Sequence, residues 1–149
     1  MNKNVFKFYV ASKWEDRYVV RDIYKEIRKH GHRVTLDWTV HDLPNRKLNQ
    51  VEKDLLLRTY AMEDINGVRE CDILIALFTE PRHQRGAMIE VGAALGLGKF
   101  VLVIGHAEDS STLLKHNLVY NIDKLEDLDN WFIGFNEVYN FMSKWITLK

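Results

Sequence analysis

The segment "CDILIALF", residues 71–78, limits the possible fold more than any other part of the sequence. Its apolar character is almost continuous, whereas a strand with one solvated face alternates apolar and polar side chains. A run of this length and composition is typical of a strand that helices cover on both faces of a parallel sheet. Parallel strands need long crossover connections, so amphipathic helices are expected on either side of this segment.

The remaining sequence alternates in the required way. Short runs rich in β-branched and aromatic residues predict strands, and apolar residues at intervals of three and four predict helices. The predicted strands are residues 6–11, 33–38, 71–78, 100–105 and 118–122, and the predicted helices are residues 16–30, 48–69, 86–97 and 128–145. This order predicts an α/β fold, a flavodoxin-like (Rossmann-like) three-layer sandwich with a five-stranded parallel sheet in the order 2-1-3-4-5. With 46% hydrophobic content, residues 1–149 are expected to form one domain.

The charge balance argues against polyanionic partners. The 21 basic and 21 acidic residues cancel, so the chain has no overall field to hold nucleic acid or an anionic membrane surface. A small molecule is the expected partner. No segment approaches the length of a membrane-spanning helix, and the first residues lead into a strand rather than a secretion signal. Because Cys71 is the only cysteine, the chain is expected to be cytoplasmic.

The sequence predicts neither a cofactor nor a metal site. His30 and His32 flank Gly31 at a helix end, where solvated side chains are the expectation. The spacing H-x-x-x-H, which is typical of zinc sites on helices, does not occur in the sequence. The glycines at residues 96–98 stand at the end of their helix, whereas a dinucleotide-binding glycine motif stands at the start.

A ligand site is predicted at one edge of the sheet. In doubly wound sheets, ligands bind outside the carboxyl ends of the strands, where the strand order reverses. Here that point lies between the first and third strands, which lead into "ASKWEDR" (residues 11–17) and "TEPRHQRG" (residues 79–86). Both loops are more polar than a plain connection needs. Trp14 and Trp38 could stack on a base at this edge, or they could simply pack in the core.

Glu90 is conspicuous in the helix that follows the second loop. It lies within "RGAMIEVGAALG", and an ionised carboxylate buried in such surroundings needs a partner, a wet cleft or a chemical role. Its side chain can point back towards the sheet edge, where the helix N-terminus would favour its charged form. Small residues such as Gly92 and Gly96 would let this helix pack closely on the sheet. The alternative is a buried salt bridge to Arg85 or Lys99.

Three segments, "FYVASKWEDR", "YAMEDINGVRECDILIALF" and "RGAMIEVGAALGLGKFVLV", together resemble the nucleoside 2-deoxyribosyltransferase superfamily, which includes deoxynucleoside 5′-monophosphate N-glycosidases. The resemblance spans about residues 5–105. It implies the flavodoxin-like sheet and an enzyme that cleaves the N-glycosidic bond of a nucleoside or (deoxy)nucleotide. The (deoxy)ribosyl group would pass to another base or to water. The resemblance also implies a homo-oligomer, either a dimer or an assembly of dimers.

The resemblance assigns roles to three residues. Glu90, in the element formed with Gly86 and Gly92, corresponds to the nucleophile. Tyr9 corresponds to a tyrosine that hydrogen-bonds this glutamate, and Asp64 to an aspartate that contacts the substrate. Breaking the bond from C1′ to the base nitrogen builds positive charge on the sugar, which a carboxylate can stabilise or capture. Asp64 would assist departure of the base. Without these roles, Asp64 would be an exposed helix residue and Tyr9 part of the core.

Further residues near the two loops are expected to bind the substrate. Gln84 stands where the transferases carry a base-binding aspartate, and its amide can still pair with a base edge. The tail "MSKWITLK" differs from the one that completes a neighbouring active site in the transferases. The predicted substrate-binding residues are Ser12, Trp14, Arg17, Trp38, Gln84, Arg85 and Gly86. The basic groups that could bind a 5′-phosphate are Lys13, Arg17, Arg82, His83 and Arg85.

Three functions remain open on the sequence alone. The first is cleavage of a nucleoside or deoxynucleoside monophosphate at its N-glycosidic bond. The second is hydrolysis of another N-glycoside, such as NAD, on the same fold. The third is a nucleotide-binding module without catalysis.

The last predicted helix indicates a packing face and a possible interface. Its large apolar side chains recur at intervals of three and four, which predicts one buried face. That face would carry Leu128, Trp131, Phe135, Val138, Met142 and Trp145. Phe132, Tyr139 and Phe141 would then point elsewhere and leave an apolar patch on a monomer, as a symmetric homo-oligomer requires.

Overall fold

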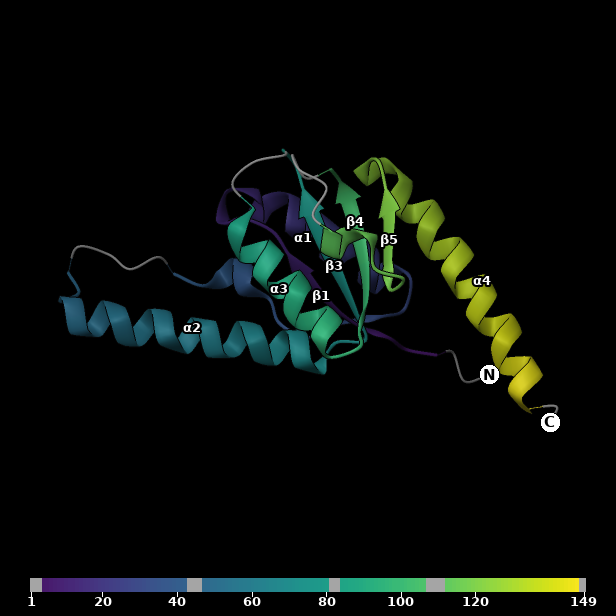
Figure 1. The fold of residues 1–149 in the computed structure, drawn as a ribbon, viewed down its shortest axis with the longest axis horizontal. Helices are drawn as coiled ribbons and strands as arrows, with labels where there is room; N and C mark the ends of the chain where they lie inside the picture. The colour runs from purple at the N-terminus through teal and green to yellow at the C-terminus, as the bar shows by residue number, and fades with distance from the viewer. Residues whose placement is uncertain (1–3, 43–46, 81–83, 107–111, 148–149) are drawn as a thin grey trace.

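A five-stranded parallel sheet forms the centre of the molecule (Figure 1). The computed structural model describes residues 4–42, 47–80, 84–106 and 112–147, with side chains described as far as residue 140. The strand order is β2-β1-β3-β4-β5, which confirms the order predicted from the sequence. The strands are β1 (Lys7–Ala11), β2 (Arg33–Val34), β3 (Ile73–Phe78), β4 (Phe100–Gly105) and β5 (Val119–Ile122).

Helices cover both faces of the sheet (Figure 1). They are α1 (Arg17–Lys29), α2 (Gln50–Glu70), α3 (Arg85–Gly96) and α4 (Leu128–Thr147). Successive side chains of a strand point to opposite faces, and β1 divides its aromatic residues accordingly. The Phe8 ring meets the α4 ring of Phe132 at 5.4 Å between centroids, whereas the Tyr9 ring lies against Gly67 of α2. One layer therefore consists of α1 and α4, and the other of α2 and α3.

The central strand β3 is buried along its whole length, as its continuous apolar run predicts. It pairs with β1 on one side and β4 on the other, and Ala11 lies opposite Ala76 in the register. The strand begins two residues later than predicted. The Cys71 backbone N–H bonds to the carbonyls of Gly67 and Val68, so this residue caps α2 instead of joining the sheet.

Strand β2 is much shorter than the prediction of residues 33–38. It ends at Val34, although the Thr35 N–H still donates to the Phe8 carbonyl at 2.9 Å. The cause is Asp37, whose side chain accepts from the Thr39 N–H and starts the 3₁₀ turn η2 (Trp38–Val40). Aspartate competes in this way with regular pairing of the backbone. Trp38 is thereby turned into the core.

Helix α2 extends beyond the sheet for much of its length (Figure 1). A capping box between Asn49 and Glu52 begins it, and its buried residues are Gly67 and Val68, near its other end. Helical spacing places Val51 and Leu55 on one side of α2, and these residues are 68% and 54% exposed. The helical prediction is confirmed. The apolar side chains near the start of the helix have no cover within the described part of the chain, whereas Leu56, Tyr60 and Ile65 are half-buried.

Helix α3 packs on the sheet through Ala87, Val91 and Ala94. A Cβ atom added to Gly92 or Gly96 would meet nothing within 4 Å. The expectation that these two glycines allow close packing is therefore wrong, because both lie away from the sheet.

The buried face of α4 matches the predicted one only in part: Leu128 is buried and Trp131 and Phe135 pack against the core, but the face is rotated beyond them. Leu128 and Phe132 are 1% and 0% exposed, whereas Val138 is 59% exposed. Tyr139 also packs inward, with its ring centroid 4.4 Å from that of Phe6. The helix is rotated so that residues 128, 132, 135 and 139 follow one stripe, which leaves no patch of Phe132 and Tyr139. The predictions for Phe141, Met142 and Trp145 lie outside the described side chains.

The two histidines beside Gly31 are not solvated as predicted. His32 is 6% exposed, and its Nδ1 accepts from the Phe6 N–H while its Nε2 lies 2.7 Å from Asn136 Oδ1. His30 contacts Asp129. Both partners, Asn136 and Asp129, come from α4, which the local sequence around the histidines does not reveal. Among the described residues, no helix combines the length and apolar character needed to cross a membrane.

Candidate active site

Three ionisable side chains from three different elements converge on the α2/α3 side of the sheet. Tyr9 comes from β1, Asp64 from α2 and Glu90 from α3. The charges of Glu90 and Asp64 both act on the Tyr9 hydroxyl, and Asp64 also acts on Glu90. We call these three residues the acidic group. The structure therefore brings together the residues to which the sequence resemblance assigns catalysis.

The acidic group is incompletely hydrogen-bonded. Tyr9 Oη, Asp64 Oδ1 and Glu90 Oε2 are buried, and none has a hydrogen-bond partner among the described residues. Buried polar atoms in folded proteins are nearly always paired, because an unpaired one costs about 1–3 kcal/mol. Three such atoms in one place are therefore destabilising unless a ligand supplies the missing partners.

Burial controls the ionisation of Glu90. It raises the pKa of the Glu90 carboxyl from 4.5 to about 8, with Tyr9 lowering this pKa and the Asp64 charge raising it. The Tyr9 hydroxyl is close enough to Glu90 to lower the pKa of its carboxyl, although the two groups do not meet the geometry of a full hydrogen bond. Burial and the charge of Glu90 also raise the pKa of Tyr9, which stays a neutral donor. Both groups can therefore hold a proton at neutral pH.

Asp64 is partly buried, and burial raises the pKa of its carboxyl. The nearby His41 opposes this shift and lowers the pKa. His41 stacks on Tyr60 with the ring planes 6° apart, and its Nε2 lies 3.1 Å from Glu63 Oε2. The sequence analysis did not identify His41. The strand predicted over residues 33–38 ends early, and His41 directly follows the turn η2 that comes after it. Its position one residue after this turn places it beside α2.

The alternative reading of Glu90 as half of a salt bridge lacks support. Among the described residues, no ion pair joins Glu90 to Arg85 or Lys99. Arg85 is exposed at the start of α3. The Glu90 carboxyl thus has neither a cationic partner of this kind nor full solvation.

Gly67 holds the Tyr9 ring in place. A Cβ atom at Gly67 would lie 2.9 Å from Tyr9 Cδ2 and 3.1 Å from Leu36 Cβ, both too close for ordinary contact. Only glycine lets α2 pass this near to the Tyr9 ring. Gly67 lies within the segment "YAMEDINGVRECDILIALF", but the need for glycine there depends on a contact with β1 that the segment alone does not reveal.

Polar bonds join the two loops at the carboxyl edge of the sheet. Asp16, 9% exposed, accepts from the Ser12 hydroxyl at 2.9 Å and from the Thr79 hydroxyl at 2.8 Å. Lys13 forms an ion pair with Glu80 across the same gap. Ser12 lies at the predicted edge but already has protein partners. The sequence analysis did not identify Asp16 as a site residue. The helical spacing of residues 16–30 marked it only as the first residue of a helix.

The aromatic and basic side chains near the first loop stack on one another. Arg17 lies over the Trp14 ring, 4.8 Å from its centroid, and over Tyr18 at 4.6 Å. The Trp14 and Trp38 rings are 6.3 Å apart. Trp38 is 7% exposed, and its indole N–H donates to the Val10 carbonyl at 2.6 Å. Trp38 thus packs in the core, while Trp14 and Arg17 are only half-buried.

The second loop leads directly into α3. Gln84 caps the helix and is 6% exposed; its Nε2 donates to the Glu80 carbonyl, and its buried Oε1 has no partner among the described residues. Gly86 is exposed, with nothing within 4 Å of an added Cβ atom. The predicted phosphate-binding residues Arg82 and His83 lie outside the described residues.

The two pockets described for this structure do not include the acidic group. One, of about 140 Å³, lies at the carboxyl ends of β4 and β5, with His106, Lys115 and Asn121 in its lining. The other lies between α1 and the start of α4. What distinguishes the acidic group is therefore its unpaired buried atoms and the raised pKa values of its side chains. Within the described residues, one set of His, Asp and Glu side chains could hold a metal ion, and it lies in the α1/α4 layer.

This arrangement combines a carboxyl group that can ionise near neutral pH with a neutral hydroxyl donor and a second carboxyl group. Such a set can stabilise a developing positive charge and can move a proton. Buried carboxyl groups with raised pKa values are typical of catalytic sites, although structural networks also produce them.

Residues 8–131 match the family described as nucleoside 2-deoxyribosyltransferase. The match includes Tyr9, Asp64 and Glu90, together with both loops at the carboxyl edge. No curated protein sequence matches the chain.

Solved structures share the fold at low sequence identity. A 2-deoxyribosyltransferase from Bacillus psychrosaccharolyticus aligns with a TM-score of 0.61 and 19% identity, over 83% of this chain and 90% of its own. A CMP N-glycosidase from Clostridium botulinum aligns with a TM-score of 0.57 and 18% identity, over 87% and 98% of the two chains. A 2-deoxyribosyltransferase from Leishmania mexicana gives 0.55 and 18%, over 87% and 97%. At these identities the likeness establishes the fold.

Proposed function

The chain belongs to the nucleoside 2-deoxyribosyltransferase family, and on this premise we propose that it cleaves the N-glycosidic bond of a nucleoside or (deoxy)nucleotide through Glu90. The observation that carries the proposal is the convergence of Tyr9, Asp64 and Glu90, each with a buried oxygen that lacks a partner among the described residues. Unpaired atoms of this kind are costly in a purely structural core and useful where a substrate supplies the missing partner.

Glu90 acts as the nucleophile in this proposal. Its ionised carboxylate attacks C1′, so that a bond forms from C1′ to the carboxylate oxygen while the bond from C1′ to the base nitrogen breaks. The electron pair of the broken bond leaves with the base. Water or a second base then attacks C1′, and the carboxylate is regenerated. Tyr9 favours the ionised form, since its hydroxyl lowers the pKa of Glu90.

Asp64 and Gln84 are assigned to the departing base. The raised pKa of Asp64 lets it carry a proton to the base, which leaves more readily when protonated. The Nε2 of Gln84 is engaged by the Glu80 carbonyl, so its free Oε1 is an acceptor. That acceptor can receive a hydrogen bond from an amino group on a base edge.

A substrate screen tests the proposal directly. Nucleosides, their 5′-monophosphates and NAD are incubated with the protein, with and without a free acceptor base, and the products are separated by liquid chromatography. Release of base without acceptor indicates hydrolysis, and a new nucleoside in its presence indicates transfer. Turnover of NAD alone would redirect the assignment to another N-glycoside. Turnover that persists in folded Glu90→Ala protein would contradict the proposal, and no turnover of any substrate would favour a binding module.

Hydrolysis of a 5′-monophosphate is the second candidate. A CMP N-glycosidase shares the fold, and basic side chains lie near the first loop. Lys13, however, is paired with Glu80 and Arg17 is stacked on Trp14. A preference for the monophosphate over the nucleoside that is reduced by Arg17→Gln would support this candidate.

We further propose that the chain assembles as a homo-oligomer, most simply from dimers. The predicted patch of Phe132 and Tyr139 does not carry this proposal, because both rings pack within the subunit. The support comes from three apolar residues of α2, Val51, Leu55 and Met62, which helical spacing places on one side. Their side chains are 68%, 54% and 68% exposed, and we call them the α2 stripe. A second copy of this stripe would cover it. Light scattering at micromolar concentration decides the matter, since a mass near 17.6 kDa with or without substrate would contradict assembly.

A further inference from the structure

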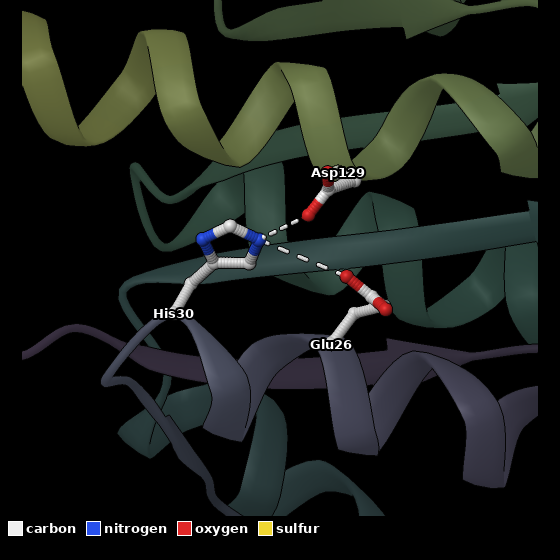
Figure 2. Close-up of side chains that lie close together, drawn as sticks. All are labelled: Glu26, His30 and Asp129. Atoms are coloured by element: carbon white, nitrogen blue, oxygen red, sulfur yellow. Dashed lines mark hydrogen bonds and ion pairs between the residues drawn. The ribbon is translucent and has the colours of Figure 1, made fainter.

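A second cluster of ionisable side chains lies in the α1/α4 layer, away from the acidic group. Glu26 and His30 stand one helical turn apart at the end of α1, and Asp129 faces them from the first turn of α4 (Figure 2). One potential ligand atom of each lies within 4.8 Å of the others. We call these three residues the histidine cluster.

The distances within the histidine cluster suit a shared ion. His30 Nε2 is 2.7 Å from Asp129 Oδ1 and 3.7 Å from Glu26 Oε2 (Figure 2). Two ligands on one tetrahedral zinc ion lie roughly 3.4 Å apart, given bonds of about 2.0–2.2 Å. The two observed separations fall on either side of this value. Side-chain rotations of a few tenths of an ångström would therefore place the atoms around an ion.

An oxygen of Glu26 points into the cluster without being satisfied there. Glu26 Oε2 is buried and has no hydrogen-bond partner among the described residues, and its 3.7 Å separation from His30 Nε2 exceeds a hydrogen bond. His30 itself is nearly enclosed, with its side chain 11% exposed. The same oxygen lies 3.7 Å from Lys29 Nζ, so it faces two nitrogen atoms without a hydrogen bond to either.

A pocket of about 240 Å³ opens beside the histidine cluster, and carboxylates dominate its lining. Its lining residues are Asp22, Glu26, Leu125, Glu126 and Asp129. The neighbouring Lys29 partly balances this charge, since its Nζ lies 3.0 Å from Asp129 Oδ1 and 3.7 Å from Glu26 Oε2. The Lys29 side chain is 60% exposed, so its ammonium group can move into solvent when another cation arrives.

We propose that Glu26, His30 and Asp129 bind a divalent transition-metal ion of the Zn²⁺ type. One imidazole nitrogen and two carboxylate oxygens supply three ligands, and a water molecule from the pocket would complete a tetrahedron. The nitrogen ligand selects Zn²⁺ and similar ions over Mg²⁺ and Ca²⁺, which prefer oxygen ligands. The bound ion would join the end of α1 to the start of α4. Its role is to fix α4 on the sheet, independently of the acidic group.

Calorimetric titration of the full chain with ZnCl₂ tests the proposal. One saturable site is expected for the wild type, with no comparable heat from MgCl₂. Glu26→Gln and Asp129→Asn should each weaken zinc binding about tenfold or more, by analogy with the loss on disturbing metal-site contacts. His106→Gln is the matched control, because it removes an imidazole from an exposed His–Asp pair of 3.3 Å and should leave the dissociation constant unchanged.

Lys29→Gln distinguishes a metal site from an ordinary ion-pair cluster. Removing the competing ammonium group should tighten zinc binding and enlarge the rise in Tm on adding ZnCl₂, and EDTA should reverse that rise. Circular dichroism confirms that each variant is folded, and Lys29→Gln is a surface change that does not disturb packing. The proposal is overturned if neither wild type nor Lys29→Gln shows saturable zinc binding. It is equally overturned if zinc binds with unchanged affinity to both Glu26→Gln and Asp129→Asn.

Discussion

The two faces of the sheet differ in how they treat buried polar groups. In the α1/α4 layer, His32 uses both ring nitrogens, one with the Phe6 N–H and the other with Asn136. In the α2/α3 layer, Tyr9, Asp64 and Glu90 each keep a buried oxygen without a partner among the described residues. Complete pairing holds helices to a sheet, whereas incomplete pairing costs stability and leaves atoms available for a ligand.

One buried carboxylate oxygen in the α1/α4 layer is also left unpaired within the described part of the chain. This atom is Glu26 Oε2, and it belongs to the histidine cluster for which a metal ion is proposed. Unpaired buried atoms thus coincide with proposed ligand sites on both faces. If the interpretation is right, substitutions in the α2/α3 layer should change activity more than stability, and those in the α1/α4 layer should do the reverse.

Glu90→Gln should produce the largest effect. Turnover should fall by about 10³-fold or more, because the amide cannot form the glycosyl ester, while ligand binding stays measurable. Retention of activity within tenfold would refute the nucleophile assignment. Kinetics with the best substrate from the screen provide the measurement.

The same variant should be more stable than the wild type at high pH. The folded protein holds the Glu90 proton up to a pKa of about 8, whereas the unfolded chain releases it near 4.5. The unfolded state therefore binds fewer protons within this window, and wild-type stability falls as the pH rises from 4.5 to 8. The Tm advantage of Glu90→Gln should grow across that range. A constant Tm difference between pH 4.5 and 8 would show that Glu90 is not held protonated by burial.

Asp64→Asn should reduce turnover by about 10²-fold for a poorly departing base, which is typical for loss of a general acid. The loss should be smaller for substrates whose base leaves easily, since these need less protonation. Equal losses for good and poor leaving groups would argue against this role. The test compares kcat/KM of wild type and variant for a series of substrates whose bases differ in basicity.

The architecture was predictable because it depends on local patterns. The buried run of β3 and the alternation of strands and helices lead to the order β2-β1-β3-β4-β5 without any knowledge of contacts. The end of β2 was not predictable in the same way, because Asp37 caps a turn at a place where the residue types favour a strand. Element types follow from periodicity, while their ends depend on individual side-chain bonds.

The site was predictable only as far as its motifs extend. Tyr9, Asp64 and Glu90 were identified from short segments, and the structure places them together. The roles of Gly67 and His41 depend on contacts between distant segments, with Tyr9 in one case and α2 in the other. The same limit explains the error over His32, since its partner Asn136 is 104 residues away. No pattern around a histidine reports a partner so distant in the chain.

His32→Leu should test the opposite face. Leucine leaves the Phe6 N–H and the Asn136 amide without their partner, which should lower the free energy of unfolding by about 2 kcal/mol. Because His32 lies in the other layer from Glu90, kcat/KM of the folded variant should equal that of the wild type. Urea unfolding, followed by tryptophan fluorescence, gives the free energy of unfolding. A loss of activity without a loss of stability would contradict the division between the two faces.

Tyr9→Phe should lower kcat/KM at neutral pH by roughly tenfold, the value of the hydrogen bond that the hydroxyl would donate to the ionised Glu90 carboxylate. The hydroxyl lowers the pKa of Glu90, so its removal should move the rising limb of the pH profile from near 8 to higher pH. At pH values above that limb, the difference between variant and wild type should shrink. A uniform loss at every pH would instead indicate that Tyr9 contacts the substrate and does not tune Glu90.

Gly67→Ala should have the smallest effect on activity of the substitutions in the α2/α3 layer and should act through Tyr9. The new methyl group would lie 2.9 Å from the Tyr9 ring, so the ring must shift by a few tenths of an ångström and carry its hydroxyl with it. Turnover should fall roughly threefold to tenfold, since small displacements of catalytic groups slow reactions disproportionately. In the Tyr9→Phe background the same change should cost no further activity, because the displaced hydroxyl is already gone. Gly96→Ala is the matched control, as its methyl group would meet nothing within 4 Å. Additive losses in the double variant would mean that Gly67 matters for packing alone and that the position of Tyr9 is set elsewhere.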